Sequence, residues 1–124
     1  MNKHSKLEEV MSQQIVNKFN NLEVIKQESV SDPKPTPVLF IQGARHGAWC
    51  WENFLPYFAE RGYNSYAVSL RGHAGIEGHN KLRWFSVNDY VQDVASVVVS
   101  ISFPLILVGH SMGGAVVQKY LEKY

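Results

Sequence analysis

The stretch LVGHSMGGAVVQ, residues 107–118, decides the fold that this sequence predicts. Residues 109–113 fit the pattern G-x-S-x-G, with an apolar run before the pattern and a helix-like run after it. A serine oxygen that attacks a carbonyl must stand exposed at the end of a strand, which requires a sharp and strained turn. Flanking glycines leave room for the strand and the helix to pack around that turn. We therefore predict that Ser111 is a nucleophile, with simple capping of the helix as the alternative.

Two segments are predicted to supply amides that stabilise an oxyanion. A helix that begins at the turn directs its free amides toward a developing anion, so the amide of Met112 is one candidate donor. The second donor should come from a loop after an earlier strand, and FIQGARHGAWCW, residues 40–51, is such a loop. Its candidate is the amide of Ala44, because Gly43 allows a close approach. The alternative is an ordinary strand–helix turn whose tryptophans serve as core.

Strand and helix patterns alternate along the chain. Short apolar runs at 38–41, 63–70 and 105–108 are typical of buried strands. Apolar residues at helical spacing predict a helix from near Asn53, another after a capping box at Ser86, and a third after the serine turn. Parallel strands need right-handed crossovers that are as long as a helix. The alternation therefore predicts an α/β fold, with a mostly parallel sheet and helices on both faces.

The first part of the chain differs in composition from the rest. Residues 1–34 are polar, helix-capable over KLEEVMSQQIVNKFNN, and then compatible with one strand, LEVIKQE. The Pro-rich stretch SVSDPKPTP follows, and proline fixes φ and removes a hydrogen-bond donor. We therefore expect an N-terminal segment and linker over 1–34 and a domain over 35–124.

Composition excludes several classes of protein. The chain has 124 residues, 45% of them hydrophobic, and a net charge of +1 at pH 7, which fits one soluble globular domain. So small a charge gives no reason to expect nucleic acid as a partner. Asp93 and Pro104 interrupt the most apolar stretch, residues 91–108, so no membrane span is predicted.

Cysteine content and ligand spacing lead to two further expectations. Cys50 is the single cysteine and the N-terminus has no apolar signal sequence, so we expect a cytoplasmic protein. No cluster of histidine, cysteine and carboxylate has the spacing of metal ligands, and residues 109–114 lack the lysine of a phosphate-binding loop. We therefore predict no metal and no organic cofactor.

The motifs in their order make the chain recognisable. VLFIQGARHGAWCWENFLPYFAERGYNSYAVSLRGHAG followed by LILVGHSMGGAVVQKYL resembles the N-terminal half of the α/β-hydrolase superfamily. The lysophospholipase-like and esterase-like members are the most similar, and the resemblance covers about residues 37–124. It implies that Ser111 is the nucleophile and that the amides of Met112 and Ala44 form the oxyanion hole.

The resemblance also implies contacts with substrate and shows where this chain departs from the pattern. Gly43 and His110 are expected to lie beside a small acyl substrate. Many members have His-Gly where this chain has Gln42-Gly43, which leaves the oxyanion amide in place. Ser69 and Ala74 stand where the family segment D-x-R-G-H-G has its Asp and its last Gly, a difference that bears on the shape of the site.

The base that a serine nucleophile needs is missing from the pattern. The family order is Ser, Asp, His, but only Glu122 is acidic after Ser111, and no histidine follows. His46 and His73 are expected near the mouth of the site as loop residues. We therefore expect a truncated hydrolase of esters, thioesters or amides that lacks its Asp and His and is inactive alone. A lyase that uses the same serine is the alternative reaction class.

The alternative to an enzyme is a non-catalytic protein. The strand at 105–108 would lie at the edge of the sheet, apolar and uncovered. Such edges pair with other chains, so this chain would bind a partner, or a second copy of itself, through that edge.

Overall fold

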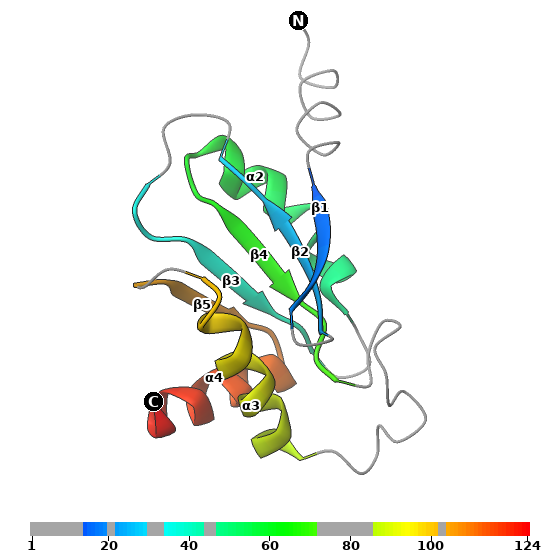
Figure 1. The fold of residues 1–124 in the computed structure, drawn as a ribbon, viewed down its shortest axis with the longest axis vertical. Coiled ribbons are helices and arrows are strands. Elements are labelled where there is room, and N and C mark those ends of the chain that lie inside the picture. The colour runs from blue at the N-terminus through cyan, green and yellow to red at the C-terminus, as the bar shows by residue number, and fades with distance from the viewer. Residues whose placement is uncertain (1–13, 20–21, 30–33, 44–46, 72–85, 102–103) are drawn as a thin grey trace, which may run out of the picture.

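The strands of the computed structural model form one sheet. The structure describes residues 14–19, 22–29, 34–43, 47–71, 86–101 and 104–124. Its strands are β1 (Ile15–Phe19), β2 (Leu22–Gln27), β3 (Val38–Ile41), β4 (Ser65–Val68) and β5 (Ile106–Gly109). They form a five-stranded sheet in the order β1-β2-β4-β3-β5 (Figure 1). The strands β4, β3 and β5 are parallel, whereas β2 is antiparallel to both β1 and β4.

Helices cover both faces of the sheet. They are the 3-10 helix η1 (Ala48–Trp51) and the α-helices α2 (Phe54–Glu60), α3 (Val87–Val98) and α4 (Met112–Lys123). The helices α3 and α4 lie on one side of the sheet and α2 on the other (Figure 1). One hydrophobic cluster joins α3 and α4 to their face, and a second cluster joins η1 and α2 to the opposite face. The predicted fold class, a mostly parallel sheet with helices on both faces, is confirmed.

The strand β3 is covered on both faces, and its side chains are apolar in both directions. Leu39 and Ile41 belong to the cluster under α3 and α4, while Val38 and Phe40 belong to the cluster under η1 and α2. All four are at most 1% exposed. This pattern is the one expected of a strand between two layers of helix, since successive side chains point to opposite faces.

The helix expected over residues 6–21 is wrong where the structure describes it. Residues 15–19 form β1, which pairs with β2, and the strand expected within 22–28 is β2. Leu22 and Val24 of β2 are buried in the core, and this tertiary packing overrides a weak local preference for helix. The change of composition near residue 34 therefore does not mark the edge of the sheet.

Local signals fix several helix ends. Ser86 and Asp89 form the predicted capping box at the start of α3. Pro56 is the third residue of α2, inside the first turn, where the missing amide hydrogen has no intrahelical acceptor. Gly62 follows that helix with a φ of 94°. The sequence did not predict η1, in which Trp51 is buried while Trp49 is 54% exposed.

No helix in the part of the chain that the structure describes is both long and apolar enough to cross a bilayer. The cytoplasmic location stays a prediction.

Candidate active site

The turn between β5 and α4 carries the serine in a strained conformation. Ser111 has a φ of 57° and a ψ of −117°, and it is the one non-glycine residue with positive φ in the described ranges. Such a backbone costs about 1–3 kcal/mol for a residue with a side chain. Ser111 is exposed, and its side chain makes no capping hydrogen bond to α4. Helix capping therefore does not explain this serine.

Two glycines beside the serine occupy positions that no side chain could share. A Cβ added at Gly109 would overlap the carbonyl of Gly113 and lie 2.7 Å from the amide nitrogen of Gly114. One added at Gly113 would overlap the carbonyl of Ile41 and lie 2.5 Å from that of Gln42. The helix α4 thus starts in direct backbone contact with the end of β3.

The register of the parallel strands brings the predicted residues to one edge of the sheet. Ile41 pairs with Gly109 in the last register position of β3 and β5. Gly43 and Ser111 each follow two residues after that pair. A Cβ added at Gly43 would lie 3.3 Å from the His110 carbonyl oxygen and 3.5 Å from the Ser111 Cβ. The structure therefore brings Gly43, His110 and Ser111 together.

The two predicted oxyanion donors differ in what the structure shows. Met112 is the first residue of α4, and an amide in the first turn of a helix has no acceptor within that helix. Its N–H therefore stays available beside Ser111. Ala44 lies outside the described residues.

Buried polar side chains tie the loop after β3 to the end of β4. Gln42 is fully buried; its Oε1 accepts a hydrogen bond from the Leu70 amide at 3.0 Å, and its Nε2 donates to the Gly43 carbonyl at 3.3 Å. The Ser69 hydroxyl, also fully buried, accepts from the Ala48 amide at 2.8 Å. From the sequence, Gln42 and Ser69 were only departures from a pattern, because their partners are distant along the chain.

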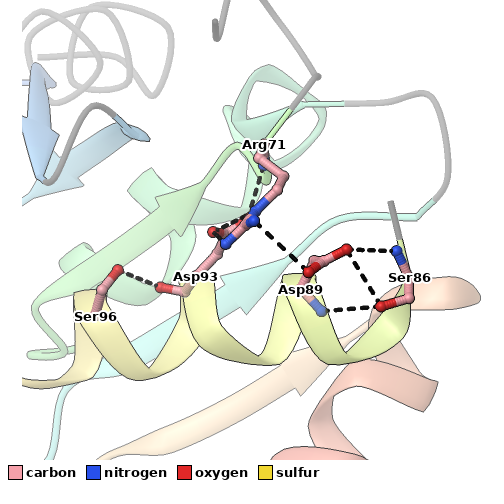
Figure 2. Close-up of polar contacts among 5 residues, drawn as sticks. All are labelled: Arg71, Ser86, Asp89, Asp93 and Ser96. Carbon is pink, nitrogen blue, oxygen red and sulfur yellow. Dashed lines mark hydrogen bonds and ion pairs between the residues drawn. The ribbon is translucent and has the colours of Figure 1, made fainter. Parts of the chain in front are cut away.

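An ion-paired cluster holds the exit of β4 against α3, as Figure 2 shows. The Arg71 guanidinium donates from Nε to Asp93 Oδ1 at 2.9 Å and pairs through Nη2 with the same oxygen at 2.8 Å. The Arg71 amide donates to Asp93 Oδ2 at 2.9 Å, and Asp89 Oδ1 lies 3.8 Å from Nη1. The hydrogen bond to Asp93 raises the pKa of Arg71. This cluster anchors one end of the segment that leads to α3.

The described residues do not include an obvious base for Ser111. His110 is the single histidine among the described residues and directly precedes Ser111 in the turn, while His46 and His73 lie outside the described ranges. Glu122 pairs with Lys119 at 3.8 Å near the end of α4. No group of three histidine, cysteine or carboxylate side chains gathers as a metal site in the residues described.

A match to a family of known proteins agrees with this geometry. Residues 38–122 match the model of the alpha/beta hydrolase family, from the first residue of β3 to the last turn of α4. The chain belongs to the alpha/beta hydrolase family.

Similar proteins include a pheophorbidase, a methylesterase and a pyrethroid hydrolase. The chain is 31% identical over 99 residues to a pheophorbidase from Raphanus sativus, covering 78% of this chain and 37% of the relative. It is 35% identical over 88 residues to a pFDCC methylesterase from Arabidopsis thaliana, covering 69% and 33%. A pyrethroid hydrolase from Sphingobium wenxiniae is 35% identical over 81 residues, with 64% and 28% covered. The chain thus spans about a third of the length of these relatives.

Solved structures of alpha/beta hydrolases share the fold. A thioesterase domain from the curacin biosynthetic pathway superposes with a TM-score of 0.71 at 24% identity, over 86% of this chain and 38% of that one. An epoxide hydrolase from Vigna radiata gives 0.70 at 22% identity, over 89% and 36%. At this identity the similarity shows the fold alone.

Proposed function

We propose that this chain carries the nucleophile of a hydrolase that acts on an ester, thioester or amide. Ser111 is the nucleophile, and the observation that carries the proposal is its exposed, strained position at the end of β5. The names of the relatives, a methylesterase and a pyrethroid hydrolase among them, favour esters.

The reaction follows from the groups around the turn. The Ser111 oxygen attacks the acyl carbon while its proton passes to a base. The carbonyl oxygen becomes an oxyanion, which the amides of Met112 and Ala44 stabilise. Collapse of this intermediate expels the alcohol, thiol or amine, protonated by the same base, and leaves an acyl ester on Ser111. Water then hydrolyses that ester, which releases the acid and restores the hydroxyl.

The base and the acid that orients it are proposed to lie outside residues 1–124. The segment after Ser111 holds no histidine and only Glu122 as a carboxylate. Glu122 points to Lys119 and lies about three turns along α4 from the serine. On this proposal the chain supplies the nucleophile and the oxyanion donors, and hydrolysis by residues 1–124 alone is slow.

A cysteine at position 111 tests the nucleophile without requiring a base, because a thiol ionises on its own near neutral pH. In a Cys50→Ser background, we expect Ser111→Cys to be acylated by p-nitrophenyl butyrate at least about tenfold faster than Ala115→Cys, an exposed thiol in α4. Mass spectrometry locates the acyl group. Equal rates at the two positions would overturn the assignment of Ser111.

A fluorophosphonate probe tests where the base lies. We expect the wild-type chain to label only slightly faster than Ser111→Ala. Rapid labelling that Ser111→Ala abolishes would show that residues 1–124 contain the base, and would overturn that part of the proposal.

The second candidate function is association through β5. Among the described strands, β5 pairs with β3 on one side only, and Ile106 is 43% exposed. A groove of about 470 Å³ lies beside it, lined by Phe40, Trp51, Asn53, Phe54, Tyr57, Phe58 and Val108. We expect Ile106→Lys, but not Val99→Lys at an 84% exposed position, to abolish a concentration-dependent dimer in sedimentation. A monomer at all concentrations would contradict this candidate.

A further inference from the structure

His110 stands next to the serine with a ring that the fold leaves available. It is exposed, and its ring makes no hydrogen bond or ion pair with any residue in the described ranges. Its backbone, in contrast, is held on both sides: the N–H donates to the Ile41 carbonyl at 3.2 Å, and the carbonyl accepts from the Gly113 N–H at 2.9 Å. The imidazole is therefore a polar group attached to a fixed point of the turn.

The ring and the serine side chain border the same point beyond the end of β3. A Cβ added at Gly43 would lie 3.3 Å from His110 Nδ1 and 3.5 Å from the Ser111 Cβ. Nδ1 is the ring atom nearest to that point, so Nε2 lies on the opposite side of the ring. A substrate whose carbonyl carbon reaches Ser111 therefore passes close to the imidazole.

The chemistry of the ring defines the group that it would bind. An imidazole keeps at least one N–H donor whether it is neutral or protonated. Its partner on a substrate is therefore a hydrogen-bond acceptor, and a carboxylate is the stronger one because an ionised partner strengthens the hydrogen bond. Two carboxylates of the neighbouring helices do not compete for the ring, since Asp93 of α3 pairs with Arg71 and Glu122 of α4 pairs with Lys119.

We infer that His110 is a specificity-determining residue that selects esters with a carboxylate close to the ester group. The ring donates an N–H to that carboxylate while the Ser111 oxygen attacks the carbonyl carbon. No proton leaves the ring, so this role differs from that of the base. The inference rests on the proposed function, because the selection is expressed only if residue 111 reacts with the ester.

Two matched pairs of esters test this selection. In the Cys50→Ser, Ser111→Cys background, the rate of acylation is measured with p-acetoxybenzoate and with its methyl ester, which differ by one charge in the alcohol part. Mono-p-nitrophenyl terephthalate and its methyl ester place the same difference in the acid part. Both members of a pair meet the same thiolate, so the ionisation of the thiol cancels from the ratio of their rates.

We expect His110→Phe, which keeps an aromatic ring but has no N–H, to lower the ratio of charged to neutral ester by at least about threefold in one pair, because the charge-assisted hydrogen bond is lost. His110→Gln keeps a donor and should hold the ratio within about twofold of the parent value. Lys119→Met is the control for overall charge, since it removes an exposed cation elsewhere on α4, and it should also stay within about twofold. Urea denaturation shows whether each variant is folded.

Two results would overturn the inference. The first is a ratio that His110→Phe leaves unchanged in both pairs, whether or not the rates themselves fall, because His110 then does not distinguish the esters. The second is an equal fall of the ratio in Lys119→Met, because the selection would then come from overall charge. If His110→Phe does not fold, His110→Leu decides in the same way. Failure of the proposed function is seen separately, as a parent thiol that p-nitrophenyl butyrate acylates no faster than Ala115→Cys.

Discussion

Two strands flank β3, and the chain leaves their ends in different ways. At the end of β5, backbone packs on backbone: Gly109 lies against the α4 backbone, and Gly113 lies against the end of β3. At the end of β4, side chains make the contacts: the Ser69 hydroxyl accepts a hydrogen bond from the first residue of η1, and Arg71 forms an ion pair with Asp93. The exposed Ser111 is therefore held by backbone contacts, where no side chain can move to relieve a misfit. The contacts at the end of β4 are made by polar side chains instead.

The largest effect is expected where backbone meets backbone. Gly113→Ala would place a methyl group on the carbonyls of Ile41 and Gln42, and we expect the free energy of unfolding to fall by about 3 kcal/mol. Gly114→Ala is the matched control, because its Cβ would meet nothing closer than the Gly109 carbonyl at 3.9 Å. It should leave stability unchanged or raise it by up to about 1 kcal/mol. Urea denaturation measures the free energy of unfolding of both variants. Equal losses in Gly113→Ala and Gly114→Ala would contradict the special role of the backbone contact at Gly113.

A smaller loss is expected at the exit of β4. Asp93→Asn removes the charge that Arg71 pairs with, and Asp93 has a side chain only 6% exposed. We expect a loss of about 2 kcal/mol in unfolding free energy, since hydrogen bonds to charged groups are worth about 1.5–3 kcal/mol. Lys119→Met breaks an exposed pair with Glu122 and should cost less than about 0.5 kcal/mol. Similar losses in the two variants would show that burial of Asp93 contributes nothing.

The strain at the serine predicts a change in the opposite direction. Ser111→Gly should raise the free energy of unfolding by about 1 kcal/mol, because glycine accepts the positive φ but is more flexible when unfolded. Ser111→Ala keeps the strain and should have little effect. If Ser111→Ala is more stable than the wild-type chain, the hydroxyl group and not the strained backbone is what lowers the stability.

The smallest effect is a pH dependence at the start of α3. The Ser86 amide that donates to Asp89 lowers the pKa of that carboxylate below its ordinary value of 3.8, with help from the Ser86 hydroxyl and Arg71. A depressed pKa in the folded state stabilises the fold above pH 3.8, and this stability is lost as the pH falls through the folded value. Asp89→Asn should flatten that part of the pH profile of the unfolding free energy, and an unchanged slope would contradict it.

The sequence predicted best the elements whose signals are local. The strand expected over 38–41 is β3 with the same bounds, because it is apolar on both faces. The strand expected over 63–70 is shorter, Ser65–Val68, since apolar residues continue beyond the paired ones. The helix expected over 6–21 is wrong at β1, which depends on pairing with β2 and not on its own pattern.

In the candidate site too, the sequence predicted the local feature but not the long-range contact. The pattern at residues 109–113 predicted a strained serine turn, and the structure brings Gly43 to it. The position of Gln42 could not be read from the sequence, because its partner Leu70 is 28 residues away and joins it only through the sheet. The nucleophilic role of Ser111 stays a prediction that acylation will test.

The contact between Gly113 and the end of β3 limits which substitutions this turn can accept during evolution. Gly113, the residue after Met112, touches the carbonyls of Ile41 and Gln42 without any intervening side chain. The space between the start of α4 and the end of β3 is therefore too small for even one added methyl group. Mutations elsewhere can change the side chains around the turn, while the separation of these two backbone segments is inherited unchanged.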